Sequence, residues 1–202
     1  MPAVQNRLPT VERQAEIIAA AIELARQFSP ALITTGDIAT AVGLTQGAVF
    51  KHFQSKDAIW LAVMSWVREQ LPAKLEAAAA GADVPLDALA AVFQAHVDFV
   101  VAHPGVPRCI FHELQQPSDS AVKQEVRALL LSYRKLLLRL LAGAVAQGKL
   151  PAELDQDAAA TLFVGIVQGL VMQSMLGGNP GAMKAQSAGV FAIYLRGIRG
   201  AA

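Results

Sequence analysis

The sequence has little of several features that would point to particular classes of protein. Cys109 is the only cysteine among the 202 residues, so an intrachain disulfide is impossible and a reducing cytoplasm is the expected compartment. The net charge is only +1, and residues 1–57 carry five basic and five acidic side chains, so binding of nucleic acid by a broad basic surface is not expected. The N-terminal segment, MPAVQNRLPT, lacks the apolar core of a signal peptide, and residues 1–8 are expected to form a loose arm.

What is present is helix-forming sequence with many apolar residues. Apolar positions recur at helical spacing and no long stretch reads as a strand, which predicts an all-α fold of about nine helices. A hydrophobic fraction of 54% is high for a monomeric soluble protein and indicates that apolar surface is buried against a partner. The first expected helix begins near Thr10, and the next three follow caps at Thr35, Thr45 and Ser55. The helix capped by Ser55 is expected to end near Leu71, before a flexible bend at 77–85. The remaining helices are expected at 86–103, 106–116, 118–147, 155–177 and 182–199.

The most informative stretch is 34–61, TTGDIATAVGLTQGAVFKHFQSKDAIWL. Gly43 suits a left-handed corner between two short helices, because glycine adopts that backbone without a steric penalty. Ala39 is small enough to let the helices approach, and the β-branched Val49 fills the angle between them. This spacing is the steric signature of a helix-turn-helix, which would place residues 45–52 in a DNA major groove; a plain helical corner would show the same spacing.

The flanking residues make this stretch resemble the DNA-binding segment of the TetR family of bacterial transcriptional regulators. The resemblance is specific over about residues 10–62 and only architectural beyond. It implies a DNA-binding head of three helices at 1–56 and an effector-binding and dimerisation body at 57–202. One residue departs from the family: Phe50 stands where a tyrosine hydroxyl usually touches a phosphate. The matching residues are Thr35, Asp37, Ile38, Ala39, Ala41, Val42, Gly43, Leu44, Gly47, Phe50, Lys51, His52, Phe53, Ser55, Lys56 and Asp57.

The expected recognition helix carries side chains suited to base edges. Gln46 can bond an adenine edge, Lys51 can donate to guanine or to phosphate, and the Ala48 methyl can contact thymine. The resemblance implies that His52 and Lys56 touch the sugar–phosphate backbone. A solvated face, with His52 as a packing residue, is the alternative. The residues predicted to contact DNA are Thr34, Thr35, Thr45, Gln46, Gly47, Ala48, Phe50, Lys51, His52 and Lys56.

A long uncharged stretch near the C-terminus predicts a dimer. Residues 158–183 contain no charge and could suggest a membrane span, but their glutamines and the Gly-Gly-Asn-Pro break favour a buried soluble helix, so no membrane partner is expected. Helices 155–177 and 182–199 are expected to pair with their copies, as the resemblance implies, and a two-fold dimer implies a palindromic operator. The predicted interface residues are Gly165, Gly169, Met172, Phe191 and Leu195.

The body is expected to hold the effector. The resemblance implies a cavity for an apolar or aromatic small molecule that releases a repressor from its operator, with no cofactor. The alternative is a soft metal site, whose ligands would be His96, His103, Cys109, His112 and Glu113. No Ser-His-Asp, paired-carboxylate or metal-helix motif supports the competing interpretation as a helical enzyme or carrier. The predicted effector residues are Trp66, His96, Phe99, His103, Cys109, His112 and Tyr133.

Overall fold

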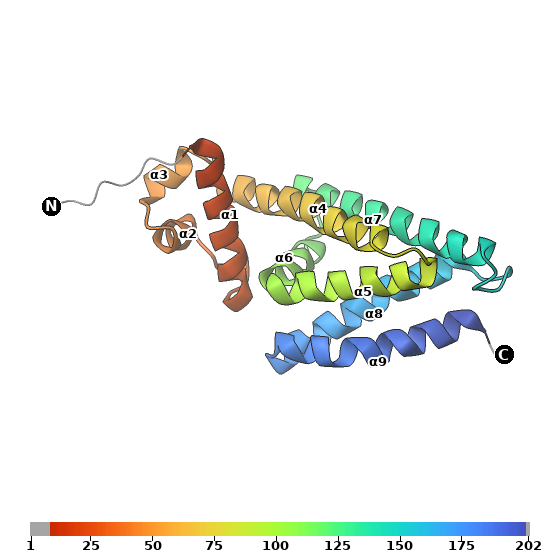
Figure 1. Ribbon diagram of the computed structural model, residues 1–202. Coiled ribbons are helices and arrows are strands. Elements are labelled where there is room, and N and C mark those ends of the chain that lie inside the picture. The colour runs from red at the N-terminus through yellow and green to blue at the C-terminus, as the bar shows by residue number, and fades with distance from the viewer. Residues whose placement is uncertain (1–8, 201–202) are drawn as a thin grey trace. The chain divides into compact units, whose positions relative to one another are not determined.

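The structure is a computed structural model that describes residues 9–200, and this part of the chain consists of helices joined by turns and loops, with no strand (Figure 1). The predicted all-α class with about nine helices is therefore confirmed. The loose arm expected at residues 1–8 lies outside the described residues. The helices are α1 (Thr10–Gln27), α2 (Thr35–Ala41), α3 (Gln46–Phe50), α4 (Lys56–Ala80), α5 (Pro85–Ala102), α6 (Gly105–Leu114), α7 (Ala121–Ala146), α8 (Gln156–Gly177) and α9 (Pro180–Arg199).

Polar side chains cap the N-termini of α2, α3 and α4. Thr45 caps α3 and Ser55 caps α4, as predicted. The cap of α2 is Thr34, one residue before the predicted Thr35. The Thr34 hydroxyl accepts from the backbone N–H of Asp37 at 3.1 Å, and the Asp37 carboxylate accepts from the Thr34 N–H at 2.8 Å. This reciprocal capping box requires a spacing of three residues, which Thr34 and Asp37 have, whereas Thr35 and Asp37 are only two apart.

Helix α4 is longer than expected, because it continues through Pro72 to Ala80. Proline lacks a backbone donor and clashes with the preceding turn, which is why an end was predicted near Leu71. The structure shows instead that Leu71, Leu75 and Ala79 are all buried at helical spacing, at 5%, 0% and 7% exposure. Their burial, together with the high helix propensity of the alanines at 77–80, outweighs the local cost of the proline. The predicted end at Leu71 was therefore wrong.

The described residues group into two compact units. The N-terminal unit comprises Met1–Trp66 with Pro104–Glu125, and the C-terminal unit comprises Val67–His103 with Val126–Ala202. Helix α6 therefore belongs to the unit that contains α1, α2 and α3. The predicted division into a DNA-binding head at 1–56 and a body at 57–202 cuts the sequence once, whereas these packing units exchange segments. That functional division stays a prediction.

One glycine allows α6 to lie directly against α1 in the N-terminal unit. A Cβ atom placed on Gly105 would come within 1.9 Å of the Ile22 carbonyl oxygen and 3.0 Å of the Arg26 backbone nitrogen. Real atoms do not approach so closely, so any larger residue would push the two helices apart. The buried residues Val106 and Cys109 continue this packed face of α6.

The C-terminal unit is built around aromatic side chains. Helices α5, α8 and α9 pack against one another (Figure 1) and contribute Phe93, Phe163 and Phe191 to one cluster. The ring centroids of Phe93 lie 5.5 Å from Phe163 and 4.9 Å from Phe191. Tyr194 closes the cluster and donates its hydroxyl proton to the Ala159 carbonyl at 3.1 Å. This cluster holds α9 against the rest of the unit.

Two helices of this unit, α5 and α8, are long and apolar enough to cross a membrane by length and composition. Core helices of soluble proteins share that length and composition. Each of the two buries one face within the C-terminal unit, which includes Val92 and Val97 on α5 and Val167 on α8.

Candidate nucleic-acid interface

The corner between α2 and α3 has the predicted geometry. Gly43 adopts a left-handed backbone with φ of +66°, and the next residue, Leu44, donates its N–H to the Ala39 carbonyl at 2.8 Å. Ala39 and Val49 are 2% and 0% exposed, so they form the packed inner side of the corner. The Thr45 hydroxyl accepts the Ala48 N–H at 3.2 Å and fixes the first turn of α3. The short helix therefore leaves the corner in a defined direction.

The outer side of α3 carries the side chains that the sequence suggested for DNA. Thr45, Gln46, Gly47 and Lys51 are exposed, and Ala48 is half-buried. Phe50 is 44% exposed, although its large apolar ring would ordinarily be buried. An exposed aromatic ring beside polar and cationic groups suits contact with sugars or with thymine methyl groups.

Gln46 is already held by a partner within the unit. Its side-chain amide donates to the Thr35 hydroxyl at 2.7 Å, and Thr35 is only 7% exposed. Thr35 thus holds the Gln46 side chain by a hydrogen bond and is itself buried. One N–H and the carbonyl oxygen of the Gln46 amide remain available for a base edge.

Thr34 stays at the exposed start of α2, where its side chain is engaged with Asp37. The hydrogen bonds from the Thr34 backbone and then from its hydroxyl lower the pKa of the Asp37 carboxyl. Asp37 therefore stays ionised, at the positive end of α2.

The two residues expected at the sugar–phosphate backbone differ in their surroundings. His52 is half-buried, and its Nδ1 is buried with no hydrogen-bond partner among residues 9–200. Its backbone carbonyl accepts from the Gln14 side chain of α1 at 3.2 Å, a contact that no local sequence signal could reveal. Lys56 is half-buried, and its Nζ donates to the Ala31 carbonyl at 2.8 Å. Lys56 therefore connects the start of α4 to the turn after α1.

Four of the predicted effector residues lie in the C-terminal unit and form two pairs. The His96 Nδ1 lies 3.0 Å from the Tyr133 hydroxyl, and Tyr133 packs on the Phe163 ring of the aromatic cluster. Burial lowers the pKa of His96 to about 4 and raises that of Tyr133, so both side chains are neutral near pH 7. The second pair is Phe99 and His103, whose ring centroids are 4.9 Å apart.

The other three predicted effector residues, Trp66, Cys109 and His112, lie in the N-terminal unit. Cys109 is buried, and burial raises the pKa of its thiol to about 12, so it is neither a thiolate nor a ready metal ligand. His112 lines a cavity described below. Within residues 9–200 no three His, Cys, Asp or Glu side chains are grouped so that they could hold a metal ion.

Two family models match this chain and together account for most of its length. Residues 17–63 match the model described as "Bacterial regulatory proteins, tetR family", and residues 85–189 match "Tetracyclin repressor-like, C-terminal domain". The chain belongs to the TetR family. This TetR-family protein is thus a DNA-binding transcriptional regulator, and the resemblance of its sequence to the family is confirmed.

Known transcriptional regulators resemble the chain over most of its length. The HTH-type transcriptional regulator TtgR of Pseudomonas putida is 28% identical over 170 residues, which cover 82% of this chain and 81% of TtgR. The fatty acid degradation regulator FadR from Bacillus halodurans has the same fold, with a TM-score of 0.82 at 20% identity over 98% of this chain and 100% of that one. FadR from Bacillus subtilis, solved in complex with stearoyl-CoA, aligns with a TM-score of 0.78 at 21% identity over 91% and 98% of the two chains.

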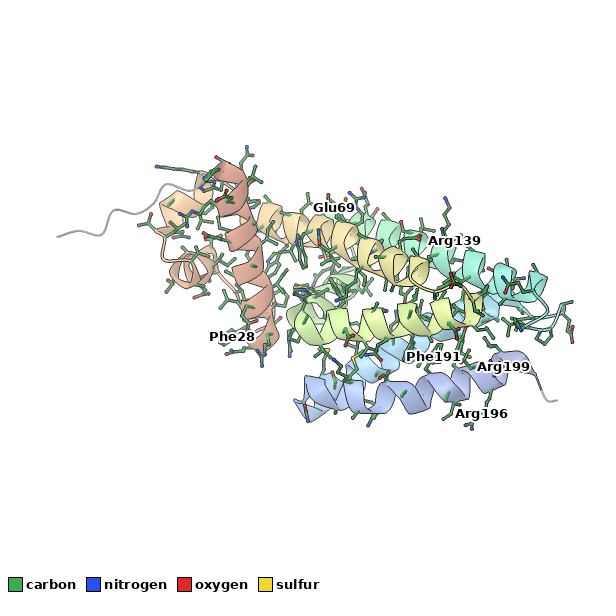
Figure 2. The ribbon with its side chains drawn as sticks, viewed as in Figure 1. Phe28, Glu69, Arg139, Phe191, Arg196 and Arg199 are labelled. Atoms are coloured by element: carbon green, nitrogen blue, oxygen red, sulfur yellow. The ribbon has the colours of Figure 1, made fainter. Side chains whose placement is uncertain are left out.

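The predicted dimer residues of this TetR-family chain do not all lie on its surface. Gly165, Gly169 and Met172 are exposed on one side of α8. Phe191, by contrast, points from α9 toward α5 (Figure 2) and is 8% exposed, because it belongs to the aromatic cluster of its own protomer. Leu195 is half-buried. The large apolar residue that α9 does expose is Ile193, which is 62% exposed.

Proposed function

We propose that this protein is a ligand-responsive repressor that binds a palindromic operator as a homodimer in the cytoplasm. The observation that carries the proposal is the exposed side of α3, where Thr45, Gln46, Phe50 and Lys51 project from a helix fixed by the Gly43 corner. Because α3 has only five residues, it can enter a major groove along its whole length.

The exposed faces of α8 and α9 support the dimer. On α8, Gly165 and Gly169 lie one turn apart, and a Cβ atom built on either would meet nothing within 4 Å. Gly189 of α9 is equally open. A glycine inside a helix costs about 1 kcal/mol relative to alanine, and nothing within the protomer requires it at these positions. Close approach of a second copy would require it. The proposed interface therefore contains Gly165, Gly169, Met172, Gly189 and Ile193.

A two-fold dimer would present two copies of α3 to successive major grooves, about 34–36 Å apart on one side of the duplex. The operator is accordingly expected to be an inverted repeat. An effector bound in the body would release the repressor only if it prefers a conformation that fits the operator less well, and a coupling of about 1–3 kcal/mol would change affinity about 5–150-fold. His96 and Tyr133 are the proposed polar contacts for such an effector.

Selection of bound fragments from genomic DNA tests this function. The protein should enrich a short inverted repeat, and Lys51→Ala or Gln46→Ala should abolish binding to it while the melting curve and the dimer stay unchanged. Lys149→Ala is the matched control, because this lysine is exposed in the turn after α7 and lies outside the proposed interface. A protein that enriches no two-fold-symmetric sequence would contradict the proposal.

A further inference from the structure

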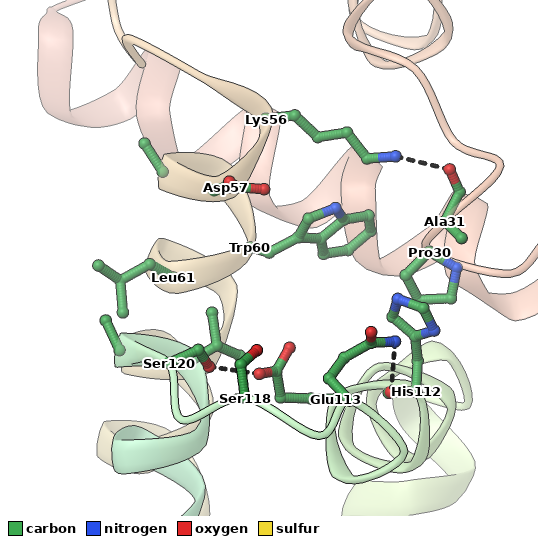
Figure 3. A pocket seen from close by; sticks show the side chains of 14 residues that line it. Pro30, Ala31, Lys56, Asp57, Trp60, Leu61, His112, Glu113, Ser118 and Ser120 are labelled. Atoms are coloured by element: carbon green, nitrogen blue, oxygen red, sulfur yellow. Dashed lines mark hydrogen bonds between the residues drawn. The ribbon is translucent and has the colours of Figure 1, made fainter.

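The N-terminal unit contains a cavity of about 550 Å³ that the DNA-binding role does not use. Its walls come from the first turns of α4, the end of α6, the start of α7 and the turn that follows α1 (Figure 3). It is large enough for a small organic molecule, and its wall is partly apolar and partly polar. Lys56, which is predicted to touch the sugar–phosphate backbone, lines the cavity, whereas none of the residues proposed to touch bases does.

With His112 counted as neutral, the side chains of this wall carry a net negative charge. Lys56 contributes one positive charge and Asp57 and Glu113 two negative charges, which gives −1. Lys56 already donates to the Ala31 carbonyl at 2.8 Å. The Glu113 carboxylate accepts a hydrogen bond from the Ser120 hydroxyl, which uses only part of its capacity as an acceptor. The cavity therefore favours a ligand with a positive charge.

An aromatic surface lies between these charges. In the view of Figure 3, the Trp60 indole is placed between the Lys56–Ala31 hydrogen bond on one side and Glu113 with Ser120 on the other. The indole Nε1 is buried and has no hydrogen-bond partner within residues 9–200, so packing alone holds the ring. An indole face attracts cations, and its area suits an aromatic or aliphatic body.

From this combination we propose that the cavity binds a small protonated amine with an aromatic or apolar body. The ammonium group would lie against Glu113, and the apolar body would pack on Trp60. A carboxylate or phosphate ligand would instead meet two acidic side chains.

Occupation of the cavity should weaken DNA binding, and this part of the inference rests on the proposed function. A cation in the cavity would repel the Lys56 ammonium and weaken its hydrogen bond to Ala31. That hydrogen bond joins the start of α4 to the turn between α1 and α2, and α2 and α3 form the helix-turn-helix. The ligand would therefore favour a state in which the recognition segment is less well supported.

Isothermal titration calorimetry with three probes of one shape tests the site without DNA. These are 2-phenylethylamine, which is cationic near pH 7, the neutral 2-phenylethanol and the anionic 3-phenylpropionate. The amine should bind saturably and at least about 10-fold more tightly than either analogue. No saturable binding of the amine at millimolar concentration, or equal binding of all three probes, would overturn the proposal.

Matched variants locate the binding. Glu113→Gln keeps the size of the side chain and an acceptor for Ser120 but removes the charge, and it should weaken the amine about 10-fold while leaving 2-phenylethanol unchanged. Glu69→Gln, which removes an exposed carboxylate further along α4 (Figure 2), should bind the amine as the natural sequence does. In a Trp66→Phe background the remaining indole is Trp60, and its fluorescence should change with the amine concentration. An unaltered affinity in Glu113→Gln would place the amine elsewhere and overturn the site.

A separate titration tests the effect on DNA. Saturating 2-phenylethylamine should lower operator affinity in the natural protein and have no such effect in Glu113→Gln. If the amine binds but operator affinity is unchanged, the coupling is overturned while the site stands. If no operator exists, the calorimetric result still decides the site, so failure of the proposed function and failure of this inference are distinguishable.

Discussion

The Gln46 side chain donates a 2.7 Å hydrogen bond to the Thr35 hydroxyl, so a residue proposed to read bases is positioned by the first residue of the preceding helix. Since Thr35 is only 7% exposed, it supports Gln46 without meeting the DNA itself. A long, flexible amide held in this way has lost rotamer freedom before the DNA arrives, which lowers the entropy cost of a base contact.

Removal of this support should weaken operator binding more than it weakens the fold. Thr35→Val keeps the shape but removes the acceptor for Gln46, and it is expected to lower operator affinity about 5–10-fold at a cost in unfolding free energy of about 1 kcal/mol. Thr40→Val is the control, since the exposed Thr40 hydroxyl donates only to the Gly36 carbonyl of its own helix. Fluorescence anisotropy on the selected operator, with urea denaturation alongside, measures both quantities. Equal operator affinities for the two variants would contradict the positioning role.

A methyl group at Gly105 should disturb the contact between α1 and α6. Its Cβ would lie 1.9 Å from the Ile22 carbonyl oxygen, a backbone atom that cannot turn aside, so Gly105→Ala should destabilise the protein by ~1–3 kcal/mol or more. Gly143→Ala is the matched control, because its new Cβ would meet only the Pro85 side chain at 3.5 Å. That variant should be neutral or stabilised by up to about 1 kcal/mol through better helix propensity. Urea midpoints of the two variants that coincide would refute the close packing of α6 on α1.

Acid should destabilise the protein through His96. Burial lowers its pKa from 6.5 to about 4, so the unfolded chain binds a proton between these values and the folded chain does not. The stabilisation is therefore complete above pH 6.5 and is lost as the pH falls toward 4, by about 3 kcal/mol from this residue. His103, whose pKa is lowered by burial and then by Lys74, adds a change in the same direction. Urea denaturation at a series of pH values should show this slope, and His96→Asn should flatten most of it; a variant that keeps the full slope would rule His96 out as its source.

A bulky residue on the glycine side of α8 should prevent self-association. Gly169→Leu fills space that is open in the protomer, so it should not disturb the protomer itself but should yield monomers or aggregates. Sedimentation velocity measures the outcome, with Gln147→Leu as a control that adds an exposed leucine at the end of α7. A sedimentation coefficient unchanged in Gly169→Leu would refute the proposed dimer.

Local sterics and hydrogen bonding made part of this molecule predictable from its sequence. The Gly43 corner and the caps at Thr45 and Ser55 depend on residues at most five apart, and each was predicted. The passage of α4 through Pro72 could not be predicted in this way, because it depends on the burial of Leu71 and Leu75 by distant residues.

Contacts between residues far apart in the chain were also not predictable from the sequence. Phe191 has the large aromatic side chain expected of an interface residue, and only its packing on Phe93 shows that it belongs to the protomer core. The role of Gly105 was equally hidden, since the atoms it would strike belong to α1, about 80 positions earlier in the chain. The hydrogen bond from Gln14 to the His52 carbonyl is a third example.

The inclusion of Pro104–Glu125 in the N-terminal unit bears on how the protein can be divided. The polypeptide passes between the two units at residues 66–67, 103–104 and 125–126, and the first and last of these passages lie inside the continuous helices α4 and α7. A recombinant fragment that stops at residue 56 would retain α1, α2 and α3 but lack the segment that packs on α1 through Gly105. Because the N-terminal unit consists of two separate segments of the chain, a single cut by a protease cannot release that unit whole.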